Sequence, residues 1–387
     1  MSDGLVYLDN AATTFPKPIE VLQGMVDAYA RVGVSPGRGN HDLAMQADDM
    51  VAQARARVAR FFGAPDPDRV IFAANATDAL NTAIGGIVRP GDHVVATRLD
   101  HNSVLRPLHH LAAAGVIAYD LAPFDGRGFV DPAAVAALIR PATRAVVMTH
   151  ASNVLGTIQP LGEIGRVCAD RGVLLVVDAA QSAGQVPIDM TALGVSALAF
   201  TGHKSLYGPS GIGGLVLQPA VEVETTRFGG TGMDSSSLVH TRAYPLRLEA
   251  GTLNLMGVIG LSLGVDFVEA RGLGAIHDRE MALTRRLRDG LAENPGIRLF
   301  CADDLADHLA VLTVDVPGMD PQDVGAILDG DFGIAVRVGL HCAPMVHRDL
   351  GTIDRGAVRF SLGVFNTPDD IDRAIAAMDA IPHPRRR

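Results

Sequence analysis

The 387-residue sequence is poor in several residue types, and each shortage excludes a class of protein. No apolar run approaches the ~20 residues that a membrane-spanning helix needs. The three cysteines, Cys168, Cys301 and Cys342, are too few and too widely spaced for a disulfide framework. The first twenty residues include Asp3 and Asp9 and lack the apolar core of a signal peptide. The sequence therefore predicts a cytoplasmic protein without a membrane span.

Positive charge is also scarce. Lysine and arginine together number 33 against 43 aspartates and glutamates, for a net charge of -10. This balance argues against a nucleic-acid backbone as the main partner. Hydrophobic residues make up 48% and charged residues 20% of the chain, which excludes global disorder and supplies a large core. At this length we expect two domains, and an enzyme is the function class that remains.

Lysine is the scarcest cation, because only Lys17 and Lys204 are lysines among the 33 basic residues. Arginine can replace lysine on a surface, but not where the chemistry needs an amine that loses its proton. Lys17 lies in a loop between Pro16 and Pro18, which makes it the weaker candidate for a chemical role. Lys204 is therefore the stronger candidate for a chemical role.

Short apolar runs alternate with Ala/Leu-rich amphipathic segments over most of the chain. The runs are continuously apolar, as strands buried on both faces are, so we predict a mostly parallel sheet between helices. The predicted strands are 70–73, 92–97, 116–119, 145–149, 173–177, 197–200 and 214–217. The predicted helices are 18–32, 43–62, 77–87, 101–114, 132–139, 161–171 and a single turn at 190–193.

The pattern changes after about residue 255, where long helices lead into a mixed α+β segment. Helices are predicted at 256–271, 277–293, 320–329 and 368–379, and strands at 309–316, 335–338 and 358–361. We therefore predict three parts. Residues 1–15 form an N-terminal arm near the small domain and the active site, 16–255 a large domain, and 256–387 a small C-terminal domain that carries a cysteine loop.

Polar side chains follow two neighbouring strands of the predicted sheet. Asp178 comes directly after one apolar run, and Lys204 follows the next in Thr201-Gly202-His203-Lys204. The carboxyl ends of parallel strands meet at one edge, where α/β sheets bind ligands. An amine that forms a Schiff base and an acid that keeps a pyridinium nitrogen protonated are what pyridoxal 5'-phosphate (PLP) requires. The alternatives are a helix-capping Asp178 and a loop cation at Lys204.

Three further segments place polar groups just past predicted strands. Ala76 and Thr77 lie where a predicted strand turns into a helix, whose first N–H groups and the Thr77 hydroxyl suit a phosphate, although threonine is also an ordinary cap. His101 suits stacking on an aromatic cofactor, and a surface N-cap is its alternative. Asn153 suits a hydrogen bond to a ring hydroxyl, and a turn asparagine is its alternative.

The C-terminal segment adds a thiol and a guanidinium. Cys342 follows His341 in a loop between Gly339 and Pro344, where a neighbouring cation would stabilise the thiolate. A buried small hydrophobe is the alternative for Cys342. Arg359 lies on a short predicted strand and offers a planar fork to a substrate carboxylate, with a surface ion pair as its alternative.

Together these motifs resemble the class V aminotransferase family of PLP enzymes, and within it the cysteine desulfurase/selenocysteine lyase group. The short cysteine loop is similar to that of the Suf-type (group II) enzymes. The resemblance implies a fold type I PLP-dependent transferase that forms a homodimer with active sites at the subunit interface. The matching motifs are Leu8-Asp9-Asn10-Ala11-Ala12, Asp178-x-x-Gln181, Gly202-His203-Lys204, Arg337-x-Gly339-x-His341-Cys342-Ala343 and Arg359-x-Ser361.

The resemblance also implies roles for single residues in cofactor binding. Lys204 would be the Schiff-base lysine, Asp178 would partner the pyridinium nitrogen, and His101 would stack on the ring. Asn153 and Gln181 would approach the phenolic oxygen. The phosphate would be held by Ala76, Thr77, Thr201, His203 and, from the other subunit, Thr231. Many Suf-type relatives have a second threonine where Ala76 stands.

For the substrate, the resemblance implies that Arg359 binds the carboxylate, assisted by Asn10, Ala11 and Arg38. Cys342 would accept the sulfur as a persulfide while L-cysteine becomes L-alanine. No metal, nucleic acid or membrane is expected. Selenocysteine lyase or another PLP-dependent C–S lyase would use the same residues, and a class V transaminase or epimerase is a more distant alternative. The sequence leaves open whether a protein then receives the sulfur.

Overall fold

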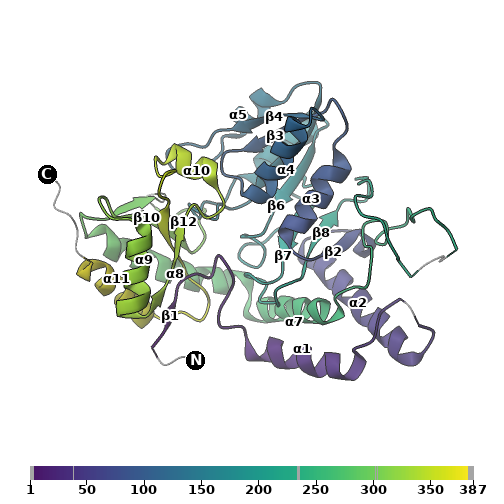
Figure 1. Ribbon diagram of the computed structural model, residues 1–387, viewed down its shortest axis with the longest axis horizontal. Helices are drawn as coiled ribbons and strands as arrows, with labels where there is room; N and C mark the ends of the chain where they lie inside the picture. The colour runs from purple at the N-terminus through teal and green to yellow at the C-terminus, as the bar shows by residue number, and fades with distance from the viewer. Residues whose placement is uncertain (1–3, 38, 233–235, 301, 303, 382–387) are drawn as a thin grey trace.

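The computed structural model describes residues 4–37, 39–232, 236–300, 302 and 304–381. Two sheets organise the chain, one of seven strands and one of four, and Figure 1 shows them side by side with their helices. A pair of two-residue strands forms a small third sheet. The α/β architecture with a seven-stranded sheet and a separate smaller sheet confirms the predicted fold class.

The seven-stranded sheet has the order β2-β8-β7-β6-β5-β3-β4, and only β8 runs antiparallel to its neighbours. Most of its strand residues are buried, as a sheet covered on both faces requires. The strands are β2 (Val70–Ala73), β3 (His93–Thr97), β4 (Ala118–Ala122), β5 (Thr143–Thr149), β6 (Leu174–Asp178), β7 (Ala197–Thr201) and β8 (Gly213–Leu217). The carboxyl ends of β3, β5, β6 and β7 therefore share one edge.

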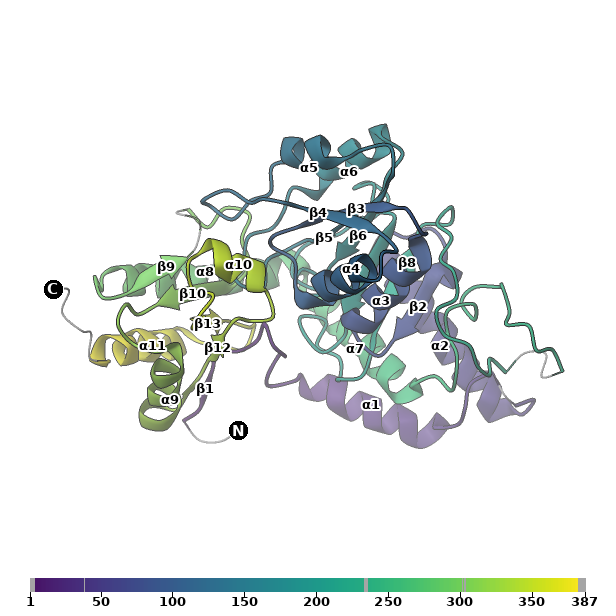
Figure 2. The ribbon, with the colours of Figure 1, turned by 45° about the horizontal axis from the view of Figure 1, so that its top comes forward.

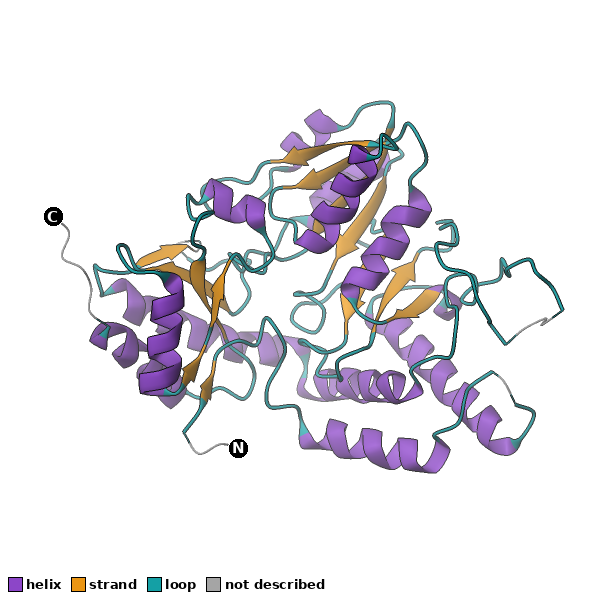
Figure 3. Cartoon of the chain, viewed as in Figure 1, coloured by secondary structure: helices purple, strands orange, loops and turns teal. Residues whose placement is uncertain are grey.

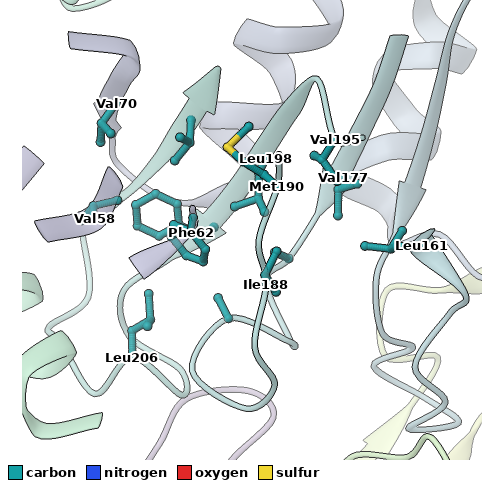
Figure 4. Packing of buried hydrophobic residues seen from close by; sticks show 14 of the residues in the cluster. Val58, Phe62, Val70, Leu161, Val177, Ile188, Met190, Val195, Leu198 and Leu206 are labelled. Carbon is teal, nitrogen blue, oxygen red and sulfur yellow. The ribbon is translucent and has the colours of Figure 1, made fainter. Parts of the chain in front are cut away.

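Helices cover both faces of this sheet, as the cartoon in Figure 3 shows. On one face lie α3 (Ala76–Ile87) and α4 (Asn102–Ala113). The other face carries α2 (Asp42–Phe61), α6 (Leu161–Asp170) and α7 (Leu255–Arg271). Figure 4 shows apolar side chains of the cluster on this second face, among them Val58, Phe62 and Leu198. Two more helices, α1 (Ile19–Val32) and α5 (Pro132–Leu138), and the short 3-10 helix η1 (Pro67–Arg69) complete this part.

The four-stranded sheet is antiparallel throughout, in the order β12-β13-β10-β9. It has its own apolar core, to which α8, α9 and α11 contribute. Figure 2 shows these helices beside the strands of this sheet. Its strands are β9 (Arg298–Phe300), β10 (Val311–Asp315), β12 (Arg337–Gly339) and β13 (Ala357–Ser361). The helices of this part are α8 (Leu273–Ala292), α9 (Pro321–Phe332), α10 (Pro344–Asp349) and α11 (Pro368–Ala380).

The N-terminal segment connects the two sheets. Its strand β1 (Val6–Tyr7) pairs in parallel with β11 (Ile334–Ala335), next to the small sheet. A few residues later, the Thr14 amide donates to the His203 carbonyl, at 3.2 Å, just beyond β7. This segment therefore lies against both sheets.

Several predicted elements differ in the structure, among them the strand predicted at 335–338, which is instead the two strands β11 and β12 of different sheets. The strand predicted at 116–119 lies at 118–122, because the Val116 amide instead donates to the Leu111 carbonyl, at 2.9 Å, and closes the end of α4. Gly115 makes this closure possible with a φ of 70°. The single turn predicted at 190–193 is present: the Leu193 amide donates to the Asp189 carbonyl at 3.0 Å, and the Asp189 carboxylate caps the turn.

Four short elements were not predicted: η1, β1, β9 and α10. Each has six residues or fewer, so no periodicity marks it in the sequence. None of the helices in the described ranges combines the length and apolarity that a bilayer crossing needs.

Candidate active site

A cavity of about 470 Å³ opens where β5, β6 and β7 end and where α3 and α4 begin. It lies at the edge where the sequence predicted a ligand site. The predicted residues that line it are Ala76, Thr77, His101, Asn153, Asp178, Gln181, Thr201, His203 and Lys204. The structure thus brings together residues that are up to 128 positions apart in the chain, from Ala76 to Lys204.

Asp178 is the last residue of β6 and is buried. Burial raises the pKa of its carboxyl, while a hydrogen bond from the Ala180 amide, at 2.9 Å, and the charge of Lys204 lower it. Its place in the parallel ladder follows from the pairing of Asp178 with Thr149 and Ala199 on the neighbouring strands. A buried carboxylate that faces a lysine is suited to bind a protonated ring nitrogen.

Lys204 follows β7 by three residues and lines the same cavity. Burial lowers the pKa of its amine from 10.5 to about 8, because a charged ammonium is poorly solvated there. Asp178 opposes this shift, whereas Arg359 and Arg337 add to it. A pKa of about 8 leaves roughly a tenth of the amine neutral at pH 7, and the neutral amine is the form that a nucleophile or a general base requires.

His101 is held by a short hydrogen-bond network at the start of α4. Its Nδ1 lies 3.0 Å from the Ser103 amide and 2.6 Å from the Ser103 hydroxyl, which lies 2.8 Å from the Thr77 hydroxyl. Because the amide can only donate, Nδ1 accepts and the ring proton is on Nε2. Burial, with Lys204 next, lowers the pKa of His101 to about 4, so the ring is neutral.

One end of the cavity is suited to an anion. The Asn75 side chain caps α3 by accepting from the Asp78 amide, and Ala76 and Thr77 form the first turn of this twelve-residue helix. Two buried polar atoms nearby, Thr201 Oγ1 and His203 Nδ1, have no hydrogen-bond partner in the described part of the chain. Buried polar groups without partners are rare, and a bound phosphate would satisfy both.

Two amide side chains line the cavity and also reach other segments. Asn153 donates through Nδ2 to the His341 carbonyl at 2.6 Å. Gln181 donates through Nε2 to the Ala11 carbonyl at 3.1 Å. The cavity wall is therefore tied to the cysteine loop and to the N-terminal segment.

Arg359 lies on β13 with its side chain 1% exposed. Its guanidinium donates to the Asn153 carbonyl at 3.0 Å and to Asp9 Oδ1 at 2.8 Å. Its Nε is buried and has no partner in the described residues. Burial lowers the pKa of Arg359, and Asp9 counteracts this shift. A buried guanidinium with a spare donor is suited to a small carboxylate.

Cys342 lies beside the cavity, in a second cleft of about 390 Å³ that shares Thr77, His101 and Ser103 with it. Cys342 is partly exposed, whereas Cys168 is buried in α6. The expectation that His341 supplies a cation next to the thiol is wrong. Its ring is buried, and burial together with the charge of Arg359 lowers its pKa to about 2.

Other predicted residues lie elsewhere. Asn10 does not line the cavity, and its amide donates to the Ser361 carbonyl at 3.1 Å. The Ala11 amide donates to the Ser361 hydroxyl at 2.9 Å. Thr231 is not among the residues that line the cavity of its own chain. Arg38, and Cys301 among the cysteines, lie outside the described residues.

Sequence reasoning missed Ser103 and the pairing partner of Arg359. Ser103 lies two residues after His101, the spacing at which a side chain can bond its own helix start, and this was the available signal. No local signal links Asp9 to Arg359, which is 350 positions away. Among the described residues, no group of three or more His, Cys, Asp or Glu side chains is arranged to hold a metal ion.

Fold and site define a two-sheet α/β protein whose cavity combines a buried lysine, a buried aspartate and a site for an anion. The family description "Aminotransferase class-V" matches residues 6–374, and the chain belongs to this family. A "Probable cysteine desulfurase" of Methanothermobacter thermautotrophicus is 37% identical over 372 residues, which are 95% of this chain and 92% of that protein.

Two solved structures share the fold over nearly the whole chain. The apo structure of a cysteine desulfurase from Thermococcus onnurineus NA1 has a TM-score of 0.91 and 34% identity, and the match covers 97% of this chain and 94% of that one. The cysteine desulfurase CsdA from Escherichia coli, in an S-sulfonic acid form, has a TM-score of 0.88 and 29% identity, with 98% and 95% covered.

Proposed function

We propose that the protein is a PLP-dependent cysteine desulfurase, which converts L-cysteine to L-alanine and takes the sulfur onto Cys342. One observation carries the proposal. The cavity that holds Lys204 and Asp178 adjoins the cleft that holds Cys342, with His101 in both. The relatives and solved structures named above support the same activity.

The residues present fit PLP. The two unpartnered polar atoms, Thr201 Oγ1 and His203 Nδ1, together with the start of α3 would hold the phosphate. Asp178 would hold the ring nitrogen, His101 would contact the ring, and Asn153 and Gln181 would reach its hydroxyl. When bound, PLP supplies an electron sink for the pair released at the substrate's α-carbon.

Two side chains would then handle the substrate. Arg359 would bind its carboxylate, since its Nε is a buried donor without a partner. Lys204, with its pKa lowered to about 8, would take the α-proton onto Nζ as a neutral amine and return it later.

Cys342 would take the sulfur. Its thiolate attacks the sulfur of L-cysteine, so that an S–S bond forms on the protein and the substrate's C–S bond breaks. The electron pair left on carbon takes up a proton, and L-alanine is the product. Transfer of the persulfide sulfur to a further acceptor completes the cycle. This role needs a partly exposed thiol beside the cavity, which is where Cys342 lies.

We further propose a homodimer in which Thr231 of each chain reaches the phosphate of the other. Support comes from Phe228, Leu238 and Val239, which are 75%, 104% and 80% exposed in the same segment. Exposed apolar side chains of this size are typical of surfaces that a partner covers. The division into residues 1–15, 16–255 and 256–387 is likewise a proposal.

The test combines cofactor mapping with product analysis. Borohydride reduction of the purified protein followed by peptide mapping is expected to place PLP on Lys204. With L-cysteine, the wild type is expected to release alanine and to carry a persulfide on Cys342. Cys342→Ser is expected to keep PLP and lose both products. Alanine release at the wild-type rate from Cys342→Ser would instead identify a lyase of another kind.

A further inference from the structure

A buried chain of hydrogen bonds lies behind Cys342. His341 Nδ1 lies 3.2 Å from His347 Nε2, and His347 Nδ1 lies 2.8 Å from the Thr352 hydroxyl. At the other end, His341 Nε2 lies 3.3 Å from the Arg337 carbonyl oxygen. All three side chains are at most 3% exposed. The chain connects β12, the cysteine loop, α10 and the turn that follows α10.

The direction of each hydrogen bond follows from the carbonyl at the end. The Arg337 oxygen can only accept, so His341 carries its proton on Nε2 and accepts at Nδ1. His347 therefore donates through Nε2 and accepts at Nδ1 from the Thr352 hydroxyl. Both rings are neutral in this arrangement. Burial, which lowers the pKa of His341 to about 2 and that of His347 to about 4, favours the same state.

The backbone next to this chain is strained. His341 and Cys342 both have left-handed backbone, with φ values of 50° and 56°. This conformation is unfavourable for residues other than glycine, so surrounding contacts must hold it. On one side, the His341 carbonyl accepts from Asn153 Nδ2 at 2.6 Å, and the Cys342 carbonyl accepts from the Asn102 amide at 2.7 Å.

The imidazole chain restrains the same two residues from the other side. It joins the residues before Cys342 to those after it, because His341 precedes the cysteine while His347 and Thr352 follow it. The Thr352 amide also donates to the His347 carbonyl at 2.8 Å, which fixes the far end of the chain. Cys342 therefore lies at the apex of a loop that is closed by side-chain hydrogen bonds.

We propose that His347 and Thr352 are positioning residues for Cys342: through His341 they hold the left-handed turn that keeps the thiol in the cleft beside the cavity. This inference rests on the proposed function, because it concerns the thiol that takes the sulfur. Loss of the chain would impair the step that needs Cys342. Steps that need only Lys204 and the cofactor would continue.

Two substrates separate these steps. L-Cysteine needs the thiol of Cys342, whereas β-chloro-L-alanine loses chloride with its bonding electrons and needs no nucleophile at the leaving group. His347→Leu removes both ring nitrogens, and we expect kcat for L-cysteine to fall about tenfold or more with KM unchanged. Turnover of β-chloro-L-alanine is expected to stay within about twofold of wild type.

Matched variants test whether the hydrogen bonds matter or only the packing. His347→Gln keeps an N–H near the position of Nε2 and is expected to recover most of the L-cysteine activity. Thr352→Val keeps the shape but removes the hydroxyl, whereas Thr352→Ser keeps the hydroxyl. We expect Thr352→Val to lower L-cysteine turnover and Thr352→Ser to preserve it. The control is His109→Leu at an exposed position of α4, which is expected to change neither activity.

Several outcomes would overturn the proposal. Equal losses with both substrates, or unchanged L-cysteine turnover in His347→Leu and Thr352→Val, would show that the chain does not position the thiol. If His347→Leu does not fold, the comparison of Thr352→Val with Thr352→Ser decides whether the chain positions the thiol. NMR of the wild type with isotope-labelled histidine gives a readout that does not depend on activity. We expect His341 and His347 as neutral Nε2–H tautomers at neutral pH, assigned through His347→Gln, and any other form contradicts the inference.

If the wild type forms no alanine from L-cysteine, the proposed function fails. The tautomers and the conformation of the loop would still be decided by NMR. The two ideas can therefore fail separately.

Discussion

The pKa of the Lys204 amine depends on its burial and on the charged side chains near it. Burial lowers the pKa of its amine to about 8, Asp178 raises it, and Arg337 lowers it further. Because only the neutral amine attacks an aldehyde, cofactor-free protein should capture PLP faster as pH rises. We expect the rate to increase about tenfold per pH unit below about pH 8 and to level off above it. Borohydride trapping at successive times measures this rate.

Substitutions of Asp178 and Arg337 are expected to shift the midpoint of this pH dependence in opposite directions. Asp178→Asn removes the negative charge that favours the ammonium, so the midpoint is expected to move to lower pH. Arg337→Gln removes a positive charge that disfavours it, so the midpoint is expected to move to higher pH. Midpoints that stay in place in both variants would mean that these charges do not control Lys204.

At the scale of elements, the end of β7 is fastened by the N-terminal segment. The His203 carbonyl accepts from Lys17 Nζ, from the Thr13 hydroxyl at 3.0 Å and from the Thr14 amide at 3.2 Å. Lys17 also donates to the Thr14 hydroxyl at 2.6 Å. Both lysines of the chain therefore meet at the end of one strand, and Lys17 holds the backbone that carries Lys204.

Lys17→Met removes these donors but keeps much of the apolar stem. We expect the variant to lose about 1–3 kcal/mol of stability, because methionine cannot replace the hydrogen bonds that the partly buried Lys17 amine donates. Urea unfolding measures the loss. The control is Gln23→Ala, which removes an exposed hydrogen bond to Asp27 on α1 and is expected to change stability by less than about 0.5 kcal/mol. An unfolding midpoint of Lys17→Met equal to that of wild type would rule out this role.

The positions of many elements could be predicted from the sequence, but some pairings between distant segments could not. Except for β4, the strands of the large sheet are largely apolar runs, so their positions and the meeting of Asp178 with Lys204 at one edge were predictable. β1 has two residues and is defined by its pairing with β11, so no local pattern in the sequence predicts it. The ion pair of Arg359 with Asp9 joins distant segments in the same way.

The cysteine loop was predictable in composition but not in conformation. The motif around Cys342 pointed to a reactive thiol, and the position of His341 next to it suggested a charged imidazole. The left-handed backbone at both residues turns the His341 ring inward, where His347 and the Arg337 carbonyl hold it neutral. That outcome depends on tertiary burial, which no spacing in the sequence encodes.

At the scale of the whole molecule, the segment between β8 and α7 stands out. Figure 1 shows it extending from the large sheet on the side away from the small sheet. The outer face of α1 adds a stripe of exposed apolar side chains at helical spacing, Ile19, Leu22, Val26 and Tyr29. Both features are typical of surfaces that a second copy covers.

Subunit mixing tests whether this second copy completes the site. If each site combines its own Lys204 with Thr231 from the other subunit, Lys204→Ala and Thr231→Ala chains complement each other. In a heterodimer, one site carries both substitutions and the other carries none. Random assembly of equal amounts makes about half of the dimers mixed, so we expect about a quarter of wild-type desulfurase activity. Each parent alone is expected to be nearly inactive. A mixture no more active than the mean of its parents would place Thr231 outside the partner's site.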